Sequence, residues 1–226
     1  MCGRFALKTP IRTVAREFGV EEMPPFEARY NIAPTQIILG VTRTEEERQV
    51  RHLKWGLVPS WARDDSMGAR LINARSETVT EKPAFREAFK QRRCLIPADG
   101  FYEWQRQASG GKQPFFFQLK DERPFGFAGL WERWQDKDGQ VIESCTILTT
   151  AANEVLRPVH DRMPVILHRD DYELWLDEDM RKRELLKELL RPYPADEMIS
   201  HPVSRAINSP RGQGAELIER LPINSA

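Results

Sequence analysis

Proline limits what this chain can fold into, because sixteen prolines are spread along its 226 residues. Prolines mark turns, so the segments between them are short. Over the first two thirds of the chain, these segments are typical of short strands. We find no internal repeat, no low-complexity segment and no polar linker that would divide the chain, so we expect a single domain over residues 1–226.

Local patterns predict a few short helices. Thr9 and Pro10 provide an N-cap and a proline at the first helical position, and Gly19 provides a C-terminal stop, so a helix is expected between them. A second short helix is expected over Lys82–Gln91. The charged, amphipathic stretch Arg181–Leu190 predicts a third helix, which covers the core with a solvated outer face.

Glycine-bearing turns predict two hairpins, one at Ser109-Gly110-Gly111 and one at Asp136–Gly139. The expected strands are residues 92–105, 113–119, 125–134, 141–149 and 165–167. Together these elements predict the α+β class, with a curved, mostly antiparallel β-sheet or barrel core flanked by short helices.

Composition and charge exclude several classes of protein. The chain is 40% apolar and 30% charged, as in an ordinary globular protein. It has no apolar run of bilayer length and no signal-peptide pattern, so we expect a cytoplasmic protein without a membrane partner. Three widely spaced cysteines without a C-x-x-C pair argue against a disulfide framework or a zinc knuckle. The formal net charge is zero, so a nucleic-acid site would need a local cluster of Arg and Lys.

Cys2 is the first candidate for chemistry. A small residue after the initiator methionine normally allows Met1 to be removed, which leaves Cys2 with a free α-amine beside its thiol. An α-amine, with a pKa of about 7.7–8.0, is a better nucleophile at neutral pH than a lysine amine. An aldehyde captured by this amine as a Schiff base can then be closed by the thiol into a thiazolidine. On position alone, an incidental cysteine is the commoner interpretation.

Three further polar residues lie in apolar or proline-bounded surroundings. Asn73 could orient a neighbour through its amide, Glu103 lies among aromatic residues that would raise its pKa, and His160 lies between two prolines that would fix its loop. Each also has a structural interpretation: a turn or strand-end Asn, an exposed strand Glu and a structural His.

Seven segments carry a resemblance to a known family. They are MCGRF (1–5), RYNIAP (29–34), WGLVPSW (55–61), INARSE (72–77), RCLIPADGFYEW (93–104), HDRMP (160–164) and HPVSR (201–205). In this order, over nearly the whole chain, they resemble the SOS-response-associated peptidase (SRAP) family, whose members shield abasic sites by covalent crosslinking.

The resemblance implies a role for each candidate. The crosslinking nucleophile corresponds to Cys2, the orienting amide to Asn73, the proton-transferring acid to Glu103 and the histidine to His160. The implied partner is single-stranded DNA that contains an abasic site. Self-cleavage after Met1 is also implied, although methionine aminopeptidase would give the same product. We expect a monomer that uses no cofactor or metal. When bound to DNA it would associate with the nucleoid, and replication-fork proteins are expected as further partners.

DNA contacts are expected from Arg4, Arg75 and Arg162 as phosphate partners and from Trp61 as an exposed ring that stacks on a base. The alternatives are ion pairs with Glu77 or Asp161 for the arginines and core packing for Trp61. The segment Ala62–Arg70 resembles a variable insertion, so no contact is transferred to it.

Three other functions compete with crosslinking. An N-terminal-nucleophile peptidase or amidohydrolase would use the Cys2 thiol on an amide. A noncatalytic single-strand binder would need no Cys2 chemistry. A metal site built from Cys2, His160, His168 and His201 lacks dense ligand spacing and is disfavoured.

Overall fold

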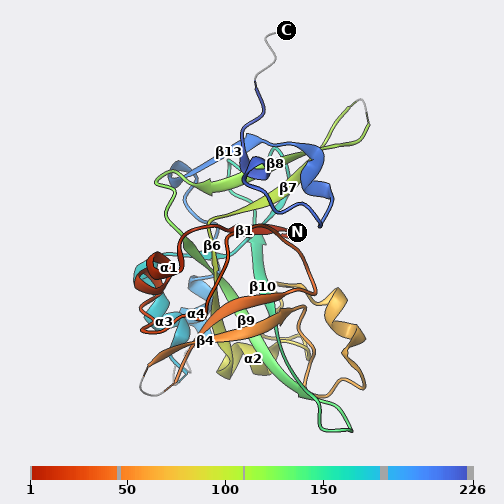
Figure 1. Cartoon of the computed structure of the whole chain (residues 1–226). Helices are drawn as coiled ribbons and strands as arrows, with labels where there is room; N and C mark the ends of the chain where they lie inside the picture. The colour runs from red at the N-terminus through yellow and green to blue at the C-terminus, as the bar shows by residue number, and fades with distance from the viewer. Residues whose placement is uncertain (1, 45–46, 109, 179–182, 223–226) are drawn as a thin grey trace.

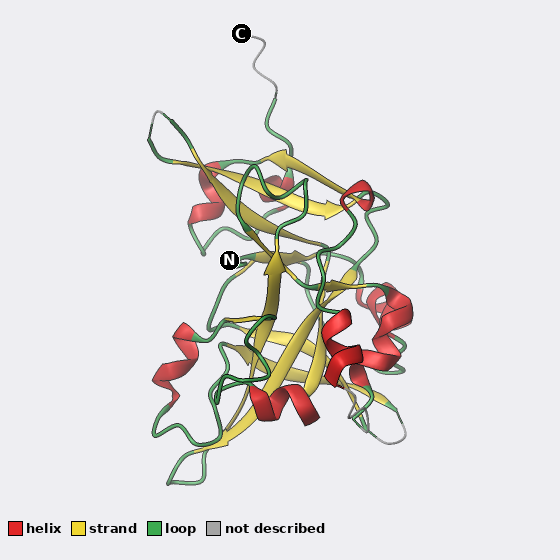
Figure 2. Cartoon of the chain, turned by 180° about the vertical axis from the view of Figure 1, so that it is seen from behind, coloured by secondary structure: helices red, strands yellow, loops and turns green. Residues whose placement is uncertain are grey.

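The computed structural model describes residues 2–44, 47–108, 110–178 and 183–222. Two sheets lie one above the other, and the N-terminal strand β1 lies where they meet (Figure 1). The helices lie along the outside of the strands (Figure 2). No helix among the described residues is long and apolar enough to span a membrane.

The lower sheet closes into a five-stranded barrel. Its strands are β3 (Ile37–Arg43), β4 (Arg48–Trp55), β6 (Arg93–Ala98), β9 (Phe125–Gln135) and β10 (Val141–Ala151). They pair in the order β10-β4-β3-β6-β9, and β9 pairs again with β10, which completes the ring. Only the β10–β4 pairing of this ring is parallel. The expected curved, mostly antiparallel core of an α+β domain is therefore confirmed.

Three short strands extend the barrel beside β9 and β10. They are β5 (Asn73–Arg75), β11 (Arg162–Pro164) and β12 (Ile166–Leu167), the last of which confirms the expected strand near residue 166. At Thr149, β10 lies between β5 and β11, because Thr149 pairs with Arg75 on one side and with Pro164 on the other.

The upper sheet is antiparallel and has the order β13-β8-β7-β1-β2. Its strands are β1 (Phe5–Leu7), β2 (Arg29–Ile32), β7 (Gly100–Arg106), β8 (Lys112–Leu119) and β13 (Met198–Pro202). Side chains alternate between its two faces. Phe5 and Phe101 pack into the main core, whereas Ala6 and Tyr102 pack against the C-terminal segment through Ile207. This sheet is therefore buried on both sides near β1.

The first predicted strand, residues 92–105, is in fact two strands in different sheets. The chain leaves the barrel at Ala98 and enters the upper sheet at Gly100. Asp99 is buried at the break, where its carboxylate accepts hydrogen bonds from the backbone N–H of Lys8 and of Thr9. A Cβ at Gly100 would lie 2.2 Å from the Phe116 ring, so the crossing needs a glycine.

Both predicted hairpins are present, joining β7 to β8 and β9 to β10. Gly110 and Gly111 adopt positive φ in the first turn, whereas Ser109 lies outside the described residues. The second turn contains Gly139 at φ +88°.

The helices are shorter than the patterns predicted. They are α1 (Ile11–Phe18), α2 (Arg86–Gln91), α3 (Tyr172–Leu176) and α4 (Arg183–Glu188), with the 3₁₀ turns η1 (Asp65–Arg70), η2 (Arg169–Asp171), η3 (Ala195–Glu197), η4 (Arg205–Asn208) and η5 (Ala215–Ile218). The start expected at Lys82 was wrong, because residues 82–85 form turns before α2. Residues 181 and 182 of the expected third helix lie outside the described residues.

The predicted N-cap of α1 was also wrong. Pro10, not Thr9, occupies the cap position, and no side chain caps the helix. The Thr9 hydroxyl instead donates to the buried carboxylate of Asp99. The C-terminal prediction is confirmed, because Gly19 is left-handed and its backbone N–H bonds to the last turn.

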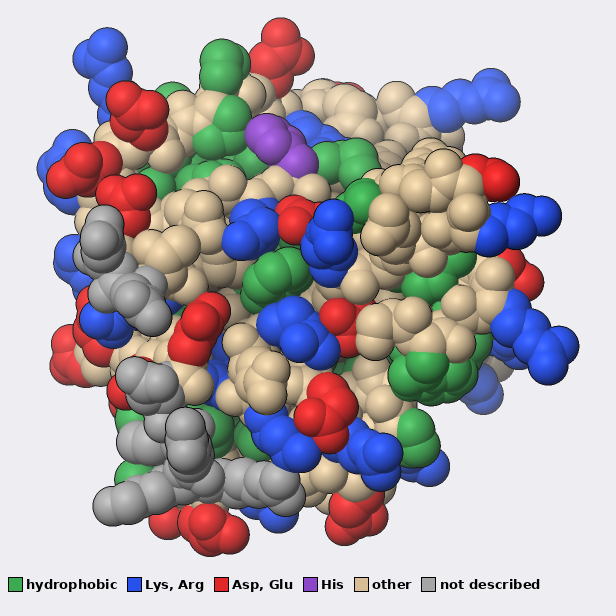
Figure 3. Space-filling model, turned by 90° about the horizontal axis from the view of Figure 1, so that it is seen from below, with side chains coloured by type: hydrophobic (Ala, Val, Ile, Leu, Met, Phe, Trp, Pro, Cys, Tyr) green, Lys and Arg blue, Asp and Glu red, His purple; other side chains and the backbone are tan. Residues whose placement is uncertain are grey.

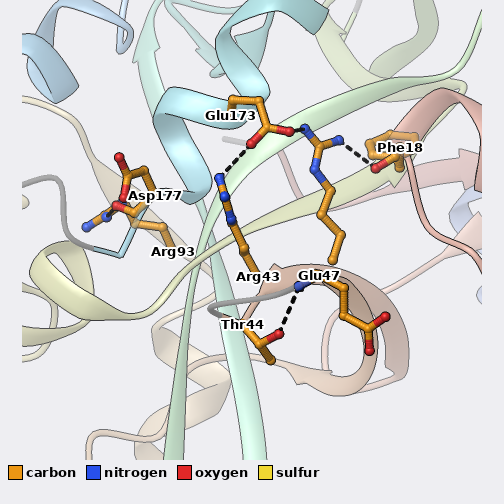
Figure 4. A network of polar contacts seen from close by, with 8 residues as sticks. Phe18, Arg43, Thr44, Glu47, Arg93, Glu173 and Asp177 are labelled. Carbon is orange, nitrogen blue, oxygen red and sulfur yellow. Dashed lines mark hydrogen bonds and ion pairs between the residues drawn. The ribbon is translucent and has the colours of Figure 1, made fainter.

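Charges on the surface are mixed in sign. On the face seen from below, Lys and Arg side chains alternate with Asp and Glu side chains (Figure 3). One such network joins α3 to the barrel: Glu173 accepts hydrogen bonds from Arg43 of β3 and Arg48 of β4, and Arg48 also binds the carbonyl of Phe18 (Figure 4).

Candidate active site

Cys2 lies just before β1, where the upper sheet covers the barrel. The backbone N–H of Tyr102 donates to the Arg4 carbonyl at 2.9 Å, which extends the β1–β7 pairing toward Cys2. The Cys2 side chain is fully buried and belongs to the main core. Burial raises the pKa of its thiol well above the ordinary value, and the negative charge of Glu103 raises it further. The thiol is therefore neutral at pH 7.

Glu103 on β7 lies close enough to Cys2 and to His160 to interact electrostatically with both. Glu103 is only 3% exposed, which excludes the alternative that it is a solvent-exposed glutamate on a strand. Burial raises the pKa of Glu103, and the electrostatic interaction with His160 offsets part of that effect when the ring is protonated. A buried carboxyl with a raised pKa can hold a proton near neutral pH and release it to a reacting group.

His160 ends a loop whose two ends are joined. The backbone N–H of Ala152 donates to the Asp161 carbonyl at 3.0 Å, and the N–H of His160 donates to Leu156 at 3.0 Å. The backbone N–H of Arg162 donates to His160 Nδ1 at 2.9 Å. Nδ1 is therefore the acceptor, and Nε2 carries the proton of the neutral ring.

Asp161 lies at a distance that would favour the opposite assignment, because its Oδ1 is 3.0 Å from His160 Nδ1. The Asp161 side chain is 89% exposed, so water screens its charge. The backbone N–H of Arg162 is fixed by the fold, and it decides the tautomer.

Asn73 begins β5 beside β10. Its amide Nδ2 donates to the Ile147 carbonyl at 3.4 Å, whereas its Oδ1 is buried without a hydrogen-bond partner among the described residues. An open acceptor of this kind can receive a hydrogen bond from a bound group. The end of β10 that is flanked by β5 and β11 reaches the level of β1 (Figures 1 and 2). Asn73 lies on β5, and His160 lies two residues before β11, so their segments flank β10 on opposite sides.

A sequence comparison identifies the family of this chain. Residues 1–210 match the family described as SOS response associated peptidase (SRAP). The chain belongs to the SRAP family.

Relatives of this SRAP chain share most of its length. It is 43% identical over 222 residues to the abasic site processing protein YoaM of Bacillus subtilis, covering 97% of this chain and 98% of that protein. It is 41% identical to the abasic site processing protein YoqW of the same organism, covering 97% and 99%. A crystal structure of a protein from Bacteroides thetaiotaomicron superposes with a TM-score of 0.88 at 27% identity, covering 97% of this chain and 100% of that one.

Two of the expected DNA-contact residues of this SRAP chain are open to solvent. The Trp61 residue is 58% exposed, so the alternative of core packing is excluded. Arg75 is exposed on β5, two residues after Asn73, so both side chains project from the same face of the strand. Among the described residues, Arg75 has no ion pair or hydrogen bond through its side chain, so its charge is free for a phosphate.

The other two arginines already have protein partners. Arg162 forms a two-pronged ion pair with Glu77 and donates to the Thr149 carbonyl at 2.7 Å. Arg4 donates to the Asn31 side chain and to the Ile207 carbonyl at 2.9 Å. Their contacts with DNA stay predictions.

Asn31 is a buried polar residue beside Arg4 that the sequence analysis did not single out. It is fully buried, and its Nδ2 donates to the carbonyls of Ser209 at 2.8 Å and Gly212 at 2.9 Å while its Oδ1 accepts from Arg4. Asn31 therefore attaches the C-terminal segment beside β1. A buried position in the RYNIAP segment was the available signal, but the partners are about 180 residues away in sequence.

The structure separates the histidines of the disfavoured metal site. His168 stacks on Tyr193, and His201 packs against Phe116. Within the described ranges, no group of three or more His, Cys, Asp or Glu side chains could hold a metal ion. The segment 62–70, which resembles a variable insertion, contains the 3₁₀ turn η1 and the three residues that precede it.

Proposed function

We propose that this protein processes abasic sites by forming a covalent crosslink between Cys2 and the ring-opened sugar in single-stranded DNA. The observation that carries the proposal is the grouping of a buried thiol, an acid of raised pKa and a histidine at the N-terminal strand. The proposal is also supported by the names of relatives, which are called abasic site processing proteins.

The reaction needs a free α-amine on Cys2, so Met1 must be removed first. Self-cleavage would use the Cys2 thiol with Glu103 as the proton carrier, and an aminopeptidase would give the same amine. The buried carboxyl of Glu103 protonates the sugar oxygen as the abasic sugar opens to its aldehyde. His160, which interacts electrostatically with Glu103, assists this proton transfer.

Crosslinking then proceeds in two bond-forming steps. The amine nitrogen of Cys2 attacks the aldehyde carbon, and loss of one water molecule gives the imine. The thiol sulfur then adds to the imine carbon while the thiol proton passes to the nitrogen, which closes the thiazolidine. Overall, one water leaves and no oxidant or reductant is needed. The neutral, buried thiol is suited to the second step because the proton that it must deliver is still present.

Arg75 and Trp61 would hold the DNA strand. Arg75 offers a cation that pairs with no other described residue, and Trp61 offers an exposed ring for stacking. Because the formal net charge is zero, binding would depend on this local surface rather than on long-range attraction.

A denaturing gel tests the proposal. Protein shown by mass spectrometry to lack Met1 is mixed with a single-stranded oligonucleotide that carries one abasic site, beside an undamaged oligonucleotide and the variants Cys2→Ala and Cys2→Ser. We expect a heat-stable adduct only with wild-type protein and damaged DNA. Cys2→Ser retains the amine, so its imine should be captured by borohydride and lost without it.

Absence of any adduct from Met1-free wild-type protein would refute the proposal. Turnover of a peptide or amide by the same preparation would then favour the amidohydrolase.

A further inference from the structure

The side chain of Gln105 links the loop that carries His160 to the strand that carries Glu103. Gln105 Nε2 donates to the Pro158 carbonyl at 3.0 Å, two residues before His160. Gln105 follows Glu103 by two positions on β7, so both side chains project from the same face of that strand. The acid and the anchor of the histidine loop therefore share one short, rigid segment.

The base of the loop is held by different contacts. Asn153 is buried; its Oδ1 accepts from the Leu156 N–H at 3.1 Å, and its Nδ2 donates to the Tyr193 carbonyl at 2.8 Å. These bonds fix where the loop leaves the core, but they do not attach its far end to β7. The side chain of Gln105 does reach the loop from β7, through its hydrogen bond to the Pro158 carbonyl.

Gln105 is itself held in place from its other end. Gln107 Nε2 donates to Gln105 Oε1 at 2.9 Å, so the amide oxygen faces Gln107 and the amide nitrogen faces Pro158. This pairing fixes the orientation of the Gln105 amide, because the reverse orientation would set two donors against each other.

We propose that Gln105 is a positioning residue that sets the distance and ring orientation of His160 relative to Glu103. The inference rests on the proposed function for its kinetic consequence, but its structural consequence does not require crosslinking. Among the described residues, the titratable groups near His160 include Glu103 from β7 and Asp161 from its own loop.

Two substitutions test the role. Gln105→Met retains length without the donor, and Gln105→Glu retains shape with an acceptor in place of the donor. The matched control is Gln135→Met, because Gln135 also donates from Nε2 to a backbone carbonyl, that of Gly139 at 3.2 Å, in the distant β9–β10 hairpin. Circular dichroism and the melting temperature establish that each variant is folded.

Single-turnover crosslinking gives the kinetic readout. We expect both Gln105 variants to lower the maximal rate roughly 10-fold, with the half-saturating DNA concentration unchanged, because misplacement of a catalytic group affects the chemical step. Gln135→Met should retain the wild-type rate. Wild-type kinetics in both folded Gln105 variants would overturn the inference.

Nitrogen-15 NMR of the His160 ring gives a readout that is independent of DNA. In wild-type protein we expect Nδ1 as acceptor and Nε2 protonated. In Gln105→Met we expect the same tautomer but displaced ring resonances, because the ring changes its distance from the charge of Glu103. Unchanged ring signals in folded Gln105→Met would contradict the inference. If the wild-type protein forms no crosslink, the proposed function fails, and the ring signals still decide the role of Gln105.

Discussion

At the scale of single residues, the site combines two groups that are costly to bury. Glu103 is almost fully enclosed, and burial raises its pKa, so its protonated form persists to higher pH than in an exposed glutamate. Burial also raises the pKa of the Cys2 thiol. The proposed reaction needs an acid first and a proton for the imine nitrogen later, and a raised pKa favours the protonated form of both groups.

The raised pKa of Glu103 predicts that the crosslinking rate has a descending limb, in which it falls with increasing pH. The rate should rise with pH as the α-amine, whose ordinary pKa is about 7.7–8.0, loses its proton. Ionisation of Glu103 should lower the rate, at a higher pH than in an exposed glutamate, because burial raises the pKa of Glu103. Glu103→Gln should be slower throughout and should lack the fall. Single-turnover rates from pH 5 to 9 measure both curves. An unchanged descending limb in Glu103→Gln would assign that limb to another group.

The same burial predicts an effect on stability. A carboxyl whose pKa is raised by folding favours the native state below its unfolded pKa, and that contribution is lost as pH rises through the folded pKa. Glu103→Gln should therefore raise the melting temperature at pH 8 by about 2–4 °C, which corresponds to about 1 kcal/mol for a chain of this size. The gain should shrink at pH 4. Calorimetry at the two pH values tests the sign, and a larger gain at pH 4 would show it to be reversed.

At the scale of elements, Arg93 of β6 joins the ends of two helices. Its guanidinium donates to the carbonyls of Phe89 at 2.7 Å and Lys90 at 2.6 Å in α2, and to those of Trp175 at 2.7 Å and Asp177 at the end of α3. Arg93 and Asp177 lie together beside the network of Glu173 (Figure 4). A cation at helix C-termini satisfies carbonyls that have no partner within the helix.

Arg93→Met should therefore lower the free energy of unfolding by about 2–4 kcal/mol, because it leaves buried carbonyls without donors. The control is Arg43→Met, which removes a partly exposed ion pair with Glu173 and should cost less than about 1 kcal/mol. Urea denaturation of both variants gives the comparison. Equal losses would mean that Arg93 contributes no more than a surface charge.

At the scale of the whole molecule, the formal charge of zero limits DNA binding to a small surface. Binding of undamaged single-stranded DNA should weaken only modestly with salt. Arg75→Gln should reduce the slope of log K against log salt by about 1, because one phosphate contact is lost. Fluorescence anisotropy over a salt series measures the slope. A slope unaltered in Arg75→Gln would remove this arginine from the DNA surface.

Local sequence patterns predicted many of the structural elements of this protein. Turn glycines and alternating apolar residues predicted both hairpins, and the ordered SRAP segments predicted the family. Helix boundaries were less well predicted, because the Thr9 hydroxyl binds Asp99 of another strand instead of capping α1. Local propensity contains no information about a partner 90 residues away.

The sequence by itself determined the chemical groups of the proposed site: the thiol of Cys2, the acid of Glu103 and the ring of His160. Only the tertiary structure decided how they are enclosed. The break at Asp99 directs β7 out of the barrel and into pairing with β1, which encloses Cys2 and Glu103 together. The raised pKa values follow from that enclosure, because desolvation depends on every neighbour that excludes water and not on the residue that carries the charge.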